Sequence, residues 1–359
     1  MLECIGAGVS NNSASDMDFV KYFSESEHMQ SLVAEIAKDG VGHPAPGSSE
    51  LIFTQKRAAS SVTQMKFVVG RYFTMYWRTA SFNLSRLFMS ILLAVLFGLV
   101  FQGVDYTSFQ GVNSGIGMIF LVLIFNGLAS FESLIPVVIH ERASVYRERA
   151  SQTYSAFWYF FASTVAELPY VFGSGLIFTA IFFPMVGFDG FWAAVFFWLN
   201  MSLMILYHAY LGHFLAYAFP NHETAAIIGV LVTSVYFLFM GFSPPTDAIP
   251  SGLKWLYYIT PHTYSLSIFI ALVFSNCPSN TTFDVALGEF TNVGSELGCQ
   301  PLKNAPVDMS HVTVKEFTEQ VFAMKYDEIA MNFVIVIAFT VFFRILALLA
   351  MRFINHQKK

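Results

Sequence analysis

Charged residues are scarce in this sequence. Only 12% of its 359 residues are Asp, Glu, Lys or Arg, against roughly 25% in an ordinary soluble domain, and 55% are hydrophobic. The apolar runs reach the roughly 20 residues that cross a hydrocarbon layer, whereas the segments of a soluble core are interrupted more often by polar turns. The sequence therefore indicates an integral membrane protein and argues against a large soluble core.

Basic clusters and catalytic motifs are also absent. The net charge is −5, and no Lys/Arg stripe interleaved with aromatics points to a nucleic-acid binder. The strings "HERAS" and "HETAA" carry Ser144 and Ala226 where a metalloprotease helix has its second His, so we expect no metal site. No G-x-S-x-G elbow supplies a nucleophile. A membrane-bound enzyme therefore stays only a distant alternative.

The phosphate-binding loop G-x-x-x-x-G-K-[ST] is missing as well. We therefore expect this chain to bind no nucleotide by that route and not to be an enzyme on its own. Any ATP-driven work has to come from another polypeptide or from a missing part. No secretory signal is visible at the start of the sequence, which places the N-terminus in the cytosol.

Two segments precede the apolar runs. Residues 1–60 are rich in Ser, Gly, Pro, Asn and acids, which predicts a cytosolic linker with one short helix over residues 25–38. Residues 61–86 place apolar side chains at helical spacing between four cations. That pattern favours an amphipathic helix at the membrane interface over a surface helix of a soluble domain.

Six membrane spans are predicted after this helix, within residues 87–356. The fold class is therefore an all-α polytopic membrane protein. The spans are residues 87–104, 116–139, 157–186, 191–219, 225–242 and 332–353.

Lys and Arg are unevenly distributed among the connections. Eight precede the first span, three lie in the charged segment (residues 141–149), and none lies in 102–113 or 187–190. Because cytosolic connections carry an excess of cations, the charged segment and both chain ends are predicted to be cytosolic. The charged segment comprises Glu141, Arg142, Arg147, Glu148 and Arg149.

The stretch 253–274 is long enough for a seventh span but is broken by Pro261. If it crossed, residues 276–330, with three cations against eight acids, would be cytosolic and the basic tail outside. We therefore predict a re-entrant pair of half-helices within an extracytoplasmic loop of about residues 243–331. A glycosylation sequon at Asn280 agrees with that side of the membrane.

Two of the three cysteines lie in the same loop. An oxidising compartment favours a disulfide between Cys277 and Cys299, and the alternative is a pair of unlinked thiols.

Polar side chains inside the predicted spans require an explanation, because ions are costly in lipid. One interpretation is that Glu132 and Glu167 contact a substrate. The other is that they lie near the cytosolic ends of the spans, where they reach water or pair with arginines of the charged segment. We favour the second interpretation. Arg344 is a third such residue. Asn126, deep in the second span, is predicted to line a cavity or to contact a neighbouring helix.

Several strings resemble the membrane domain of G-subfamily, pleiotropic-drug-resistance (PDR) ABC transporters. They are "QMKFVVGRYFTMYWRTASFNLSRLF", "HERASVYRERASQTYS", "AELPY" and the long cysteine-bearing loop, and the resemblance covers residues 61–356. It implies six spans per half, a connecting helix at the interface, and a cytosolic loop at the charged segment that couples nucleotide-binding domains to the helices. Residues 1–60 then follow a nucleotide-binding domain that this sequence lacks.

The resemblance also implies a cavity between two such halves. Matching positions on the second and fifth spans are Asn126, Ala129, Thr233 and Ser234. The expected function is export of hydrophobic or amphipathic small molecules or lipids at the plasma membrane. The expected partners are nucleotide-binding domains carrying ATP and Mg²⁺, a second transmembrane half and membrane lipids. The alternative is a non-pumping truncated half, a channel or a lipid scramblase.

Overall fold

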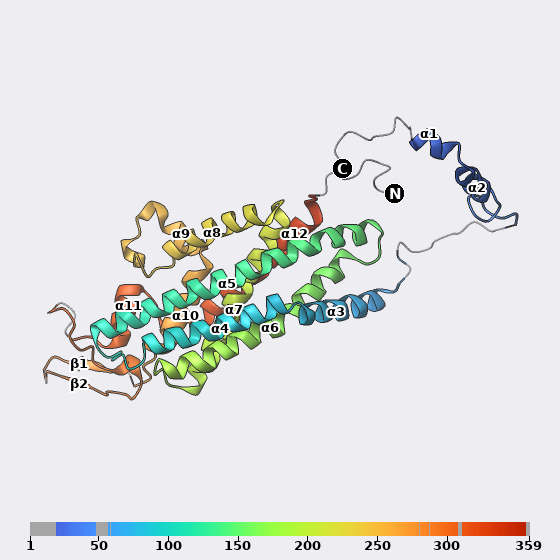
Figure 1. Cartoon of the computed structure of the whole chain (residues 1–359). Helices are drawn as coiled ribbons and strands as arrows, with labels where there is room; N and C mark the ends of the chain where they lie inside the picture. Colours follow the sequence, from blue (N-terminus) through green and yellow to red (C-terminus); the bar gives the residue numbers. More distant parts are fainter. Residues whose placement is uncertain are drawn as a thin grey trace, which may run out of the picture. The chain divides into compact units, whose positions relative to one another are not determined.

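The computed structural model describes residues 19–47, 57, 59–279, 281–286, 288–307 and 311–356 (Figure 1). The chain divides into two units, residues 1–56 and 57–359. The described part of the first unit contains the short helices α1 (Phe19–Ser24) and α2 (Glu27–Ile36). The Ser26 hydroxyl caps α2 by accepting from the amide of Met29, which satisfies one of the unpaired N–H groups of the first turn. The helix predicted over residues 25–38 corresponds to α2.

The second unit begins with α3 (Ser61–Arg78), whose buried residues recur every four positions: Gln64, Val68, Tyr72 and Tyr76. This spacing places them on one face of a helix, and α3 packs against α6 (Ala156–Met185). The predicted helix over residues 61–86 is interrupted at Thr79, and α4 (Ala80–Val100) starts after it. The Asn83 side-chain amide donates to the carbonyl of Tyr76, which stabilises this break because it satisfies a carbonyl at the end of α3.

Five helices in the described residues are long and apolar enough to cross a membrane, or six if one bent pair counts as a span. They belong to α4, α5 (Phe109–Ala150), α6 (Ala156–Met185), α7 (Phe191–Ala218) and α12 (Ile329–Phe353). This confirms the all-α polytopic fold class. The fifth predicted span corresponds to α8 (His222–Leu238), which has only 17 residues and is shorter than the roughly 20 needed for a perpendicular crossing.

The charged segment is not a loop. It forms the last turns of α5, which runs for 42 residues, and only residues 151–155 connect α5 to α6. The prediction of a loop here is wrong because Glu, Arg and Ala are strong helix formers and no Gly or Pro interrupts residues 141–150. At 1.5 Å per residue α5 is about 63 Å long, roughly twice the thickness of the hydrocarbon core. One end of α5 therefore extends beyond the apolar layer.

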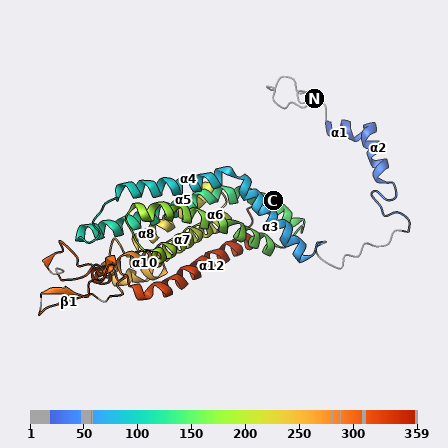
Figure 2. The same ribbon diagram turned by 90° about the horizontal axis from the view of Figure 1, so that it is seen from below.

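Helix α7 lies at the centre of the bundle. Its residues from Asn200 to His213 are all buried, and it packs against α5, α6, α10 (Pro261–Phe274) and α12. Figures 1 and 2 show the long helices side by side, with α3 at one end of this unit and the described part of residues 282–322 at the other. The charged end of α5 lies toward α3.

The segment between α8 and α12 contains short helices and a β-hairpin, and its helix α10 packs into the bundle against α7 and α12. Helices α9 (Lys254–Ile259) and α10 (Pro261–Phe274) meet at an angle of 77°, with Pro261 as the first residue of α10. Strands β1 (Thr282–Asp284) and β2 (Glu289–Thr291) form an antiparallel hairpin, and α11 (Val314–Phe322) follows. The bend at Pro261 agrees with the predicted pair of half-helices.

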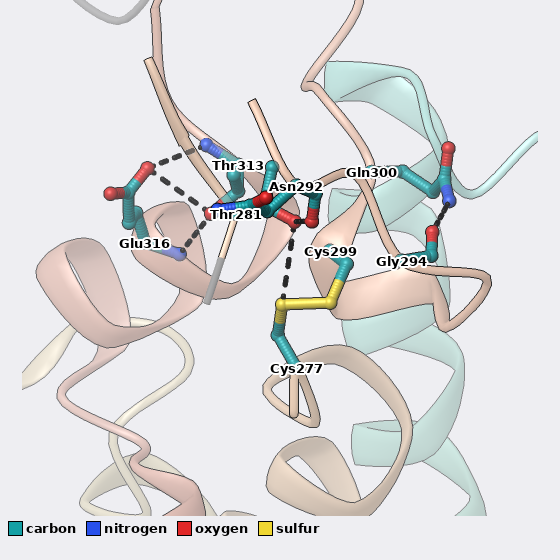
Figure 3. Close-up of a disulfide and its surroundings, with 8 residues drawn as sticks. All are labelled: Cys277, Thr281, Asn292, Gly294, Cys299, Gln300, Thr313 and Glu316. Atoms are coloured by element: carbon teal, nitrogen blue, oxygen red, sulfur yellow. Dashed lines mark hydrogen bonds between the residues drawn. A yellow bond between two sulfur atoms is a disulfide. The ribbon is translucent and has the colours of Figure 1, made fainter. Parts of the chain in front are cut away.

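A disulfide joins Cys277, which follows α10, to Cys299 (Figure 3). Both cysteines are buried, and their Cα atoms are 4.9 Å apart. Thr281, whose hydroxyl donates to the carbonyl of Asn292 at 2.9 Å, lies beside the bridge. The predicted glycosylation residue, Asn280, lies outside the described residues.

Candidate functional site

Arg142 in the charged segment closes the end of α7. Its guanidinium donates to the carbonyls of Ala216 at 2.7 Å, Phe219 at 2.6 Å and Pro220 at 2.5 Å. The last carbonyls of a helix lack intrahelical partners and carry partial negative charge. A buried cation donates hydrogen bonds to these carbonyls and balances their charge. Arg142 thereby joins the end of α5 to the end of α7.

Glu148 and Glu141 bind α3. The Glu148 carboxylate pairs with Arg71 at 2.6 Å and accepts a hydrogen bond from the Tyr154 hydroxyl. Burial raises the pKa of Tyr154, and the bond to Glu148 raises it further, so the phenol keeps the proton that it donates. Glu141 accepts from the Tyr72 hydroxyl at 3.2 Å. Two carboxylates of the charged segment thus contact the connecting helix.

Two further contacts join the charged segment to the end of α12. The Arg149 guanidinium donates to the carbonyl of Met351 at 3.2 Å, and the Tyr146 hydroxyl donates to that of Ile354, also at 3.2 Å. Arg147 is exposed, and its guanidinium makes a long hydrogen bond of 3.4 Å to the Ser144 hydroxyl on its own helix. Four of the five predicted coupling residues therefore contact neighbouring helices, and Arg147 faces outward.

A groove follows the same end of α5. It encloses about 840 Å³ between the α3–α4 break and α5, and its lining includes Arg71, Thr79, His140, Glu141 and Glu148. A second pocket of about 320 Å³ continues between α4 and α5. Its lining residues are Ser85, Arg86, Met89, Ser90, Asn126, Ala129, Ser130, Glu132, Ser133 and Ile205.

The structure brings together two of the four predicted cavity residues. Asn126 and Ala129 line the smaller pocket, and the Asn126 amide donates to the carbonyl of Val122 at 2.9 Å within its own helix. Thr233 and Ser234 lie on α8 and do not line that pocket. Thr233 is buried and Ser234 exposed, so the two face different surroundings.

Glu167 has a partner that the sequence did not reveal. Its side chain is fully buried and accepts from both terminal nitrogens of Arg86, at 3.2 and 3.3 Å, while His213 lies 3.8 Å away. The expectation that Glu167 reaches water or pairs with the charged segment is therefore wrong. The sequence pattern groups Arg86 with the cations of the interfacial helix. Its position directly before the apolar run "LFMSILLAVLF" is the signal that could have indicated a buried arginine.

Arg344 has acceptors on α6. It donates to the hydroxyls of Thr164 and Ser163 and to the carbonyl of Phe160, and its guanidinium lies 4.1 Å from the centre of the Phe160 ring. A charged group inside a helical bundle is tolerated when hydrogen bonds and ring faces replace its water. Arg344 is thus an internal tie between α12 and α6.

Clusters of metal-ligating side chains are absent from the described part of the chain, in which no group of three or more His, Cys, Asp or Glu residues was found. The closest imidazoles are those of His208 and His262, whose Nε2 atoms are 2.9 Å apart and fully buried. At this distance the N–H of one ring donates to the nitrogen of the other, so the two histidines form a hydrogen-bonded pair between α7 and α10.

Comparison with known proteins defines the class of this bundle. Residues 63–274 match the family of ABC-2 type transporters, and residues 289–359 match the CDR ABC transporter family. The chain belongs to the ABC-2 type transporter family. The two matches together identify it as a transmembrane domain of the PDR type in the G subfamily.

Plant proteins are among the similar sequences. ABC transporter G family member 33 of Arabidopsis thaliana is 30% identical over 350 residues, which cover 96% of this chain and 23% of that protein. Member 36 of Oryza sativa subsp. indica is 29% identical over 356 residues, covering 98% of this chain and 22% of its own length. The chain thus spans about a fifth of the length of these relatives.

Proposed function

We propose that this chain is the transmembrane half of an ATP-driven exporter of hydrophobic or amphipathic small molecules or lipids. The supporting observation is that a single helix, α5, carries both the pocket residues Asn126 and Ala129 and the charged segment. A movement applied to the charged end would reach the pocket along α5, because backbone hydrogen bonds make a helix stiff along its axis. Pro136 lies between the two regions and removes one of these bonds, but α5 continues through it to Ala150.

Nucleotide-binding domains outside this chain would supply the force. ATP and Mg²⁺ would bind to those domains, and this chain contributes the surface that they move. Arg147 is suited to contact such a domain because it is exposed and, unlike the exposed Arg149, makes no hydrogen bond to another of the described helices. Arg142, Glu148 and Arg149 would distribute the movement to α7, α3 and α12 through their hydrogen bonds. A second transmembrane half would complete the cavity, and of the two α8 residues the exposed Ser234 could face it, whereas Thr233 is buried within this chain.

The distribution of cations supports an orientation. The charged segment and both ends of the chain would be cytosolic, and residues 243–331 would lie outside the cell at a plasma membrane. The disulfide between Cys277 and Cys299 supports that side, since disulfides persist in oxidising compartments.

Uptake into inside-out membrane vesicles tests the proposal. Vesicles containing the whole protein should accumulate a hydrophobic dye when ATP is supplied, and should not do so with a non-hydrolysable analogue. A channel, a scramblase or a truncated half that does not pump would instead let the compound equilibrate at the same rate with and without ATP. That second result would contradict the proposed export.

A further inference from the structure

Glu132 is an unusual residue for a membrane span. It lies on α5 and lines the smaller pocket together with Asn126 and Ser133. In the described part of the chain no hydrogen bond or ion pair of its carboxylate is found. Removing an ion from water is costly in a membrane, and ionisable groups there mark ligand or ion pathways unless a partner satisfies them. Structural pairing, which explains Glu167 and Arg344, does not explain Glu132.

The charges around the pocket leave Glu132 unbalanced. Arg86 is the cation among the lining residues, and its terminal nitrogens bind the fully buried Glu167. Arg344 does not line the pocket and donates to polar atoms of α6. The pair of Arg86 and Glu167 is neutral as a unit, so the negative charge of Glu132 determines the sign of the pocket wall.

The two pockets form one continuous groove. Both are lined by Ser85 of α4 and Ser133 of α5, so the larger groove leads into the smaller pocket. In the larger groove Arg71 is paired with Glu148, and burial raises the pKa of the remaining carboxyl, Glu141, to about 7, so that it adds a partial negative charge at neutral pH. Apolar side chains separate these carboxylates, among them Met75, Val137, Val145, Met89 and Ile205.

We propose that this α4–α5 groove binds cationic amphipathic compounds and that Glu132 is the residue that selects for their positive charge. The inference rests on the proposed function for transport, but binding itself requires no nucleotide. A cation carried on an apolar body is weakly hydrated, so it enters an apolar groove readily and gains the attraction of a carboxylate in a medium of low dielectric constant. A compound of the same size with a negative charge meets repulsion at Glu132.

Binding of two ions of nearly equal size and opposite charge tests the proposal. Tetraphenylphosphonium and tetraphenylborate would be titrated by equilibrium dialysis against the whole protein in nanodiscs of zwitterionic lipid, with empty nanodiscs subtracted. The wild type should prefer the cation. Glu132→Gln should weaken binding of tetraphenylphosphonium by about tenfold, and binding of tetraphenylborate should be unchanged or tighter.

Two variants complete the design. Glu132→Asp keeps the charge and should retain the preference for the cation. Glu223→Gln removes an exposed carboxylate from the first turn of α8, outside both pockets, and should bind both ions as the wild type does. Unchanged binding of the cation by Glu132→Gln, or equal loss of both ions, would overturn the assignment. Failure of the proposed function would look different, because ATP-dependent uptake would be absent while the preference for the cation persisted.

Discussion

At the scale of single residues, buried arginines join helices that are far apart in the sequence. Arg142 donates to the end of α7, 74 to 78 residues later. Arg86 binds Glu167 on α6, 81 residues later. In each case the cation replaces water for groups that the apolar surroundings cannot solvate. These side chains therefore determine where the ends of the helices meet.

Arg142→Ala should destabilise the bundle by about 2–4 kcal/mol, since it leaves three carbonyls at the end of α7 without their donor. Unfolding of the purified protein in mixed micelles, followed by circular dichroism, measures the change. Arg147→Ala is the matched control because it removes the same charge from an exposed neighbour. Equal stability of the two variants would contradict the capping role of Arg142.

The pair of Arg86 and Glu167 predicts strong coupling between two substitutions. Glu167→Leu or Arg86→Leu alone leaves one charge buried without its partner and should cost about 3–5 kcal/mol. The double variant removes both charges and should be more stable than either single variant. Unfolding in mixed micelles, measured for the wild type, both single variants and the double variant, completes this double-mutant cycle. Additive losses in the double variant would show that the two side chains act independently.

Sequence patterns reveal these residues only in part. Glu132, Glu167 and Arg344 were identified because charge is rare inside apolar runs. Their partners were not, since Glu167 binds an arginine that the sequence places among the cations of the interfacial helix. Hydrogen-bond partners 80 residues away depend on how the helices pack, and no local periodicity encodes that.

At the scale of helices, hydrophobic runs predict the spans well and their ends poorly. The predicted span 116–139 lies within α5, but α5 begins at Phe109 and continues to Ala150. Charge indicates where a segment leaves lipid, but it does not indicate where a helix ends, because Glu and Arg are good helix formers in water. The break at Thr79 was missed for the opposite reason, since neither Gly nor Pro marks it.

Close packing between α5 and α8 depends on Gly229. A Cβ atom placed there would lie 1.7 Å from the ring of Phe131, which is fully buried. Gly229→Ala should therefore destabilise the protein by about 1–3 kcal/mol through overpacking. Gly173→Ala on α6 is the matched control, since nothing lies within 4 Å of its Cβ position. The measurement is again unfolding in micelles, and a neutral Gly229→Ala would contradict the packing shown here.

At the scale of the whole molecule, α5 connects two regions to which we assign different roles. One region is the groove between α4 and α5, and the other is the charged segment bonded to α3, α7 and α12. The resemblance of sequence motifs to PDR-type transporters predicted the charged segment and a cavity lined in part by Asn126 and Ala129. It predicted neither the groove between α4 and α5 nor the continuation of α5 through Pro136 to the charged segment. The central claim is that movement of the charged segment reaches the groove through α5 and its pair with α3.

The number of compounds transported per ATP hydrolysed, measured with charge swaps at Arg71 and Glu148, tests this claim most directly. Glu148→Arg opposes two cations where the 2.6 Å ion pair joins α5 to α3, and should lower that ratio by about fivefold or more. The double variant Arg71→Glu with Glu148→Arg restores an opposite pair and should recover most of the ratio. Normal coupling in Glu148→Arg alone would contradict the account.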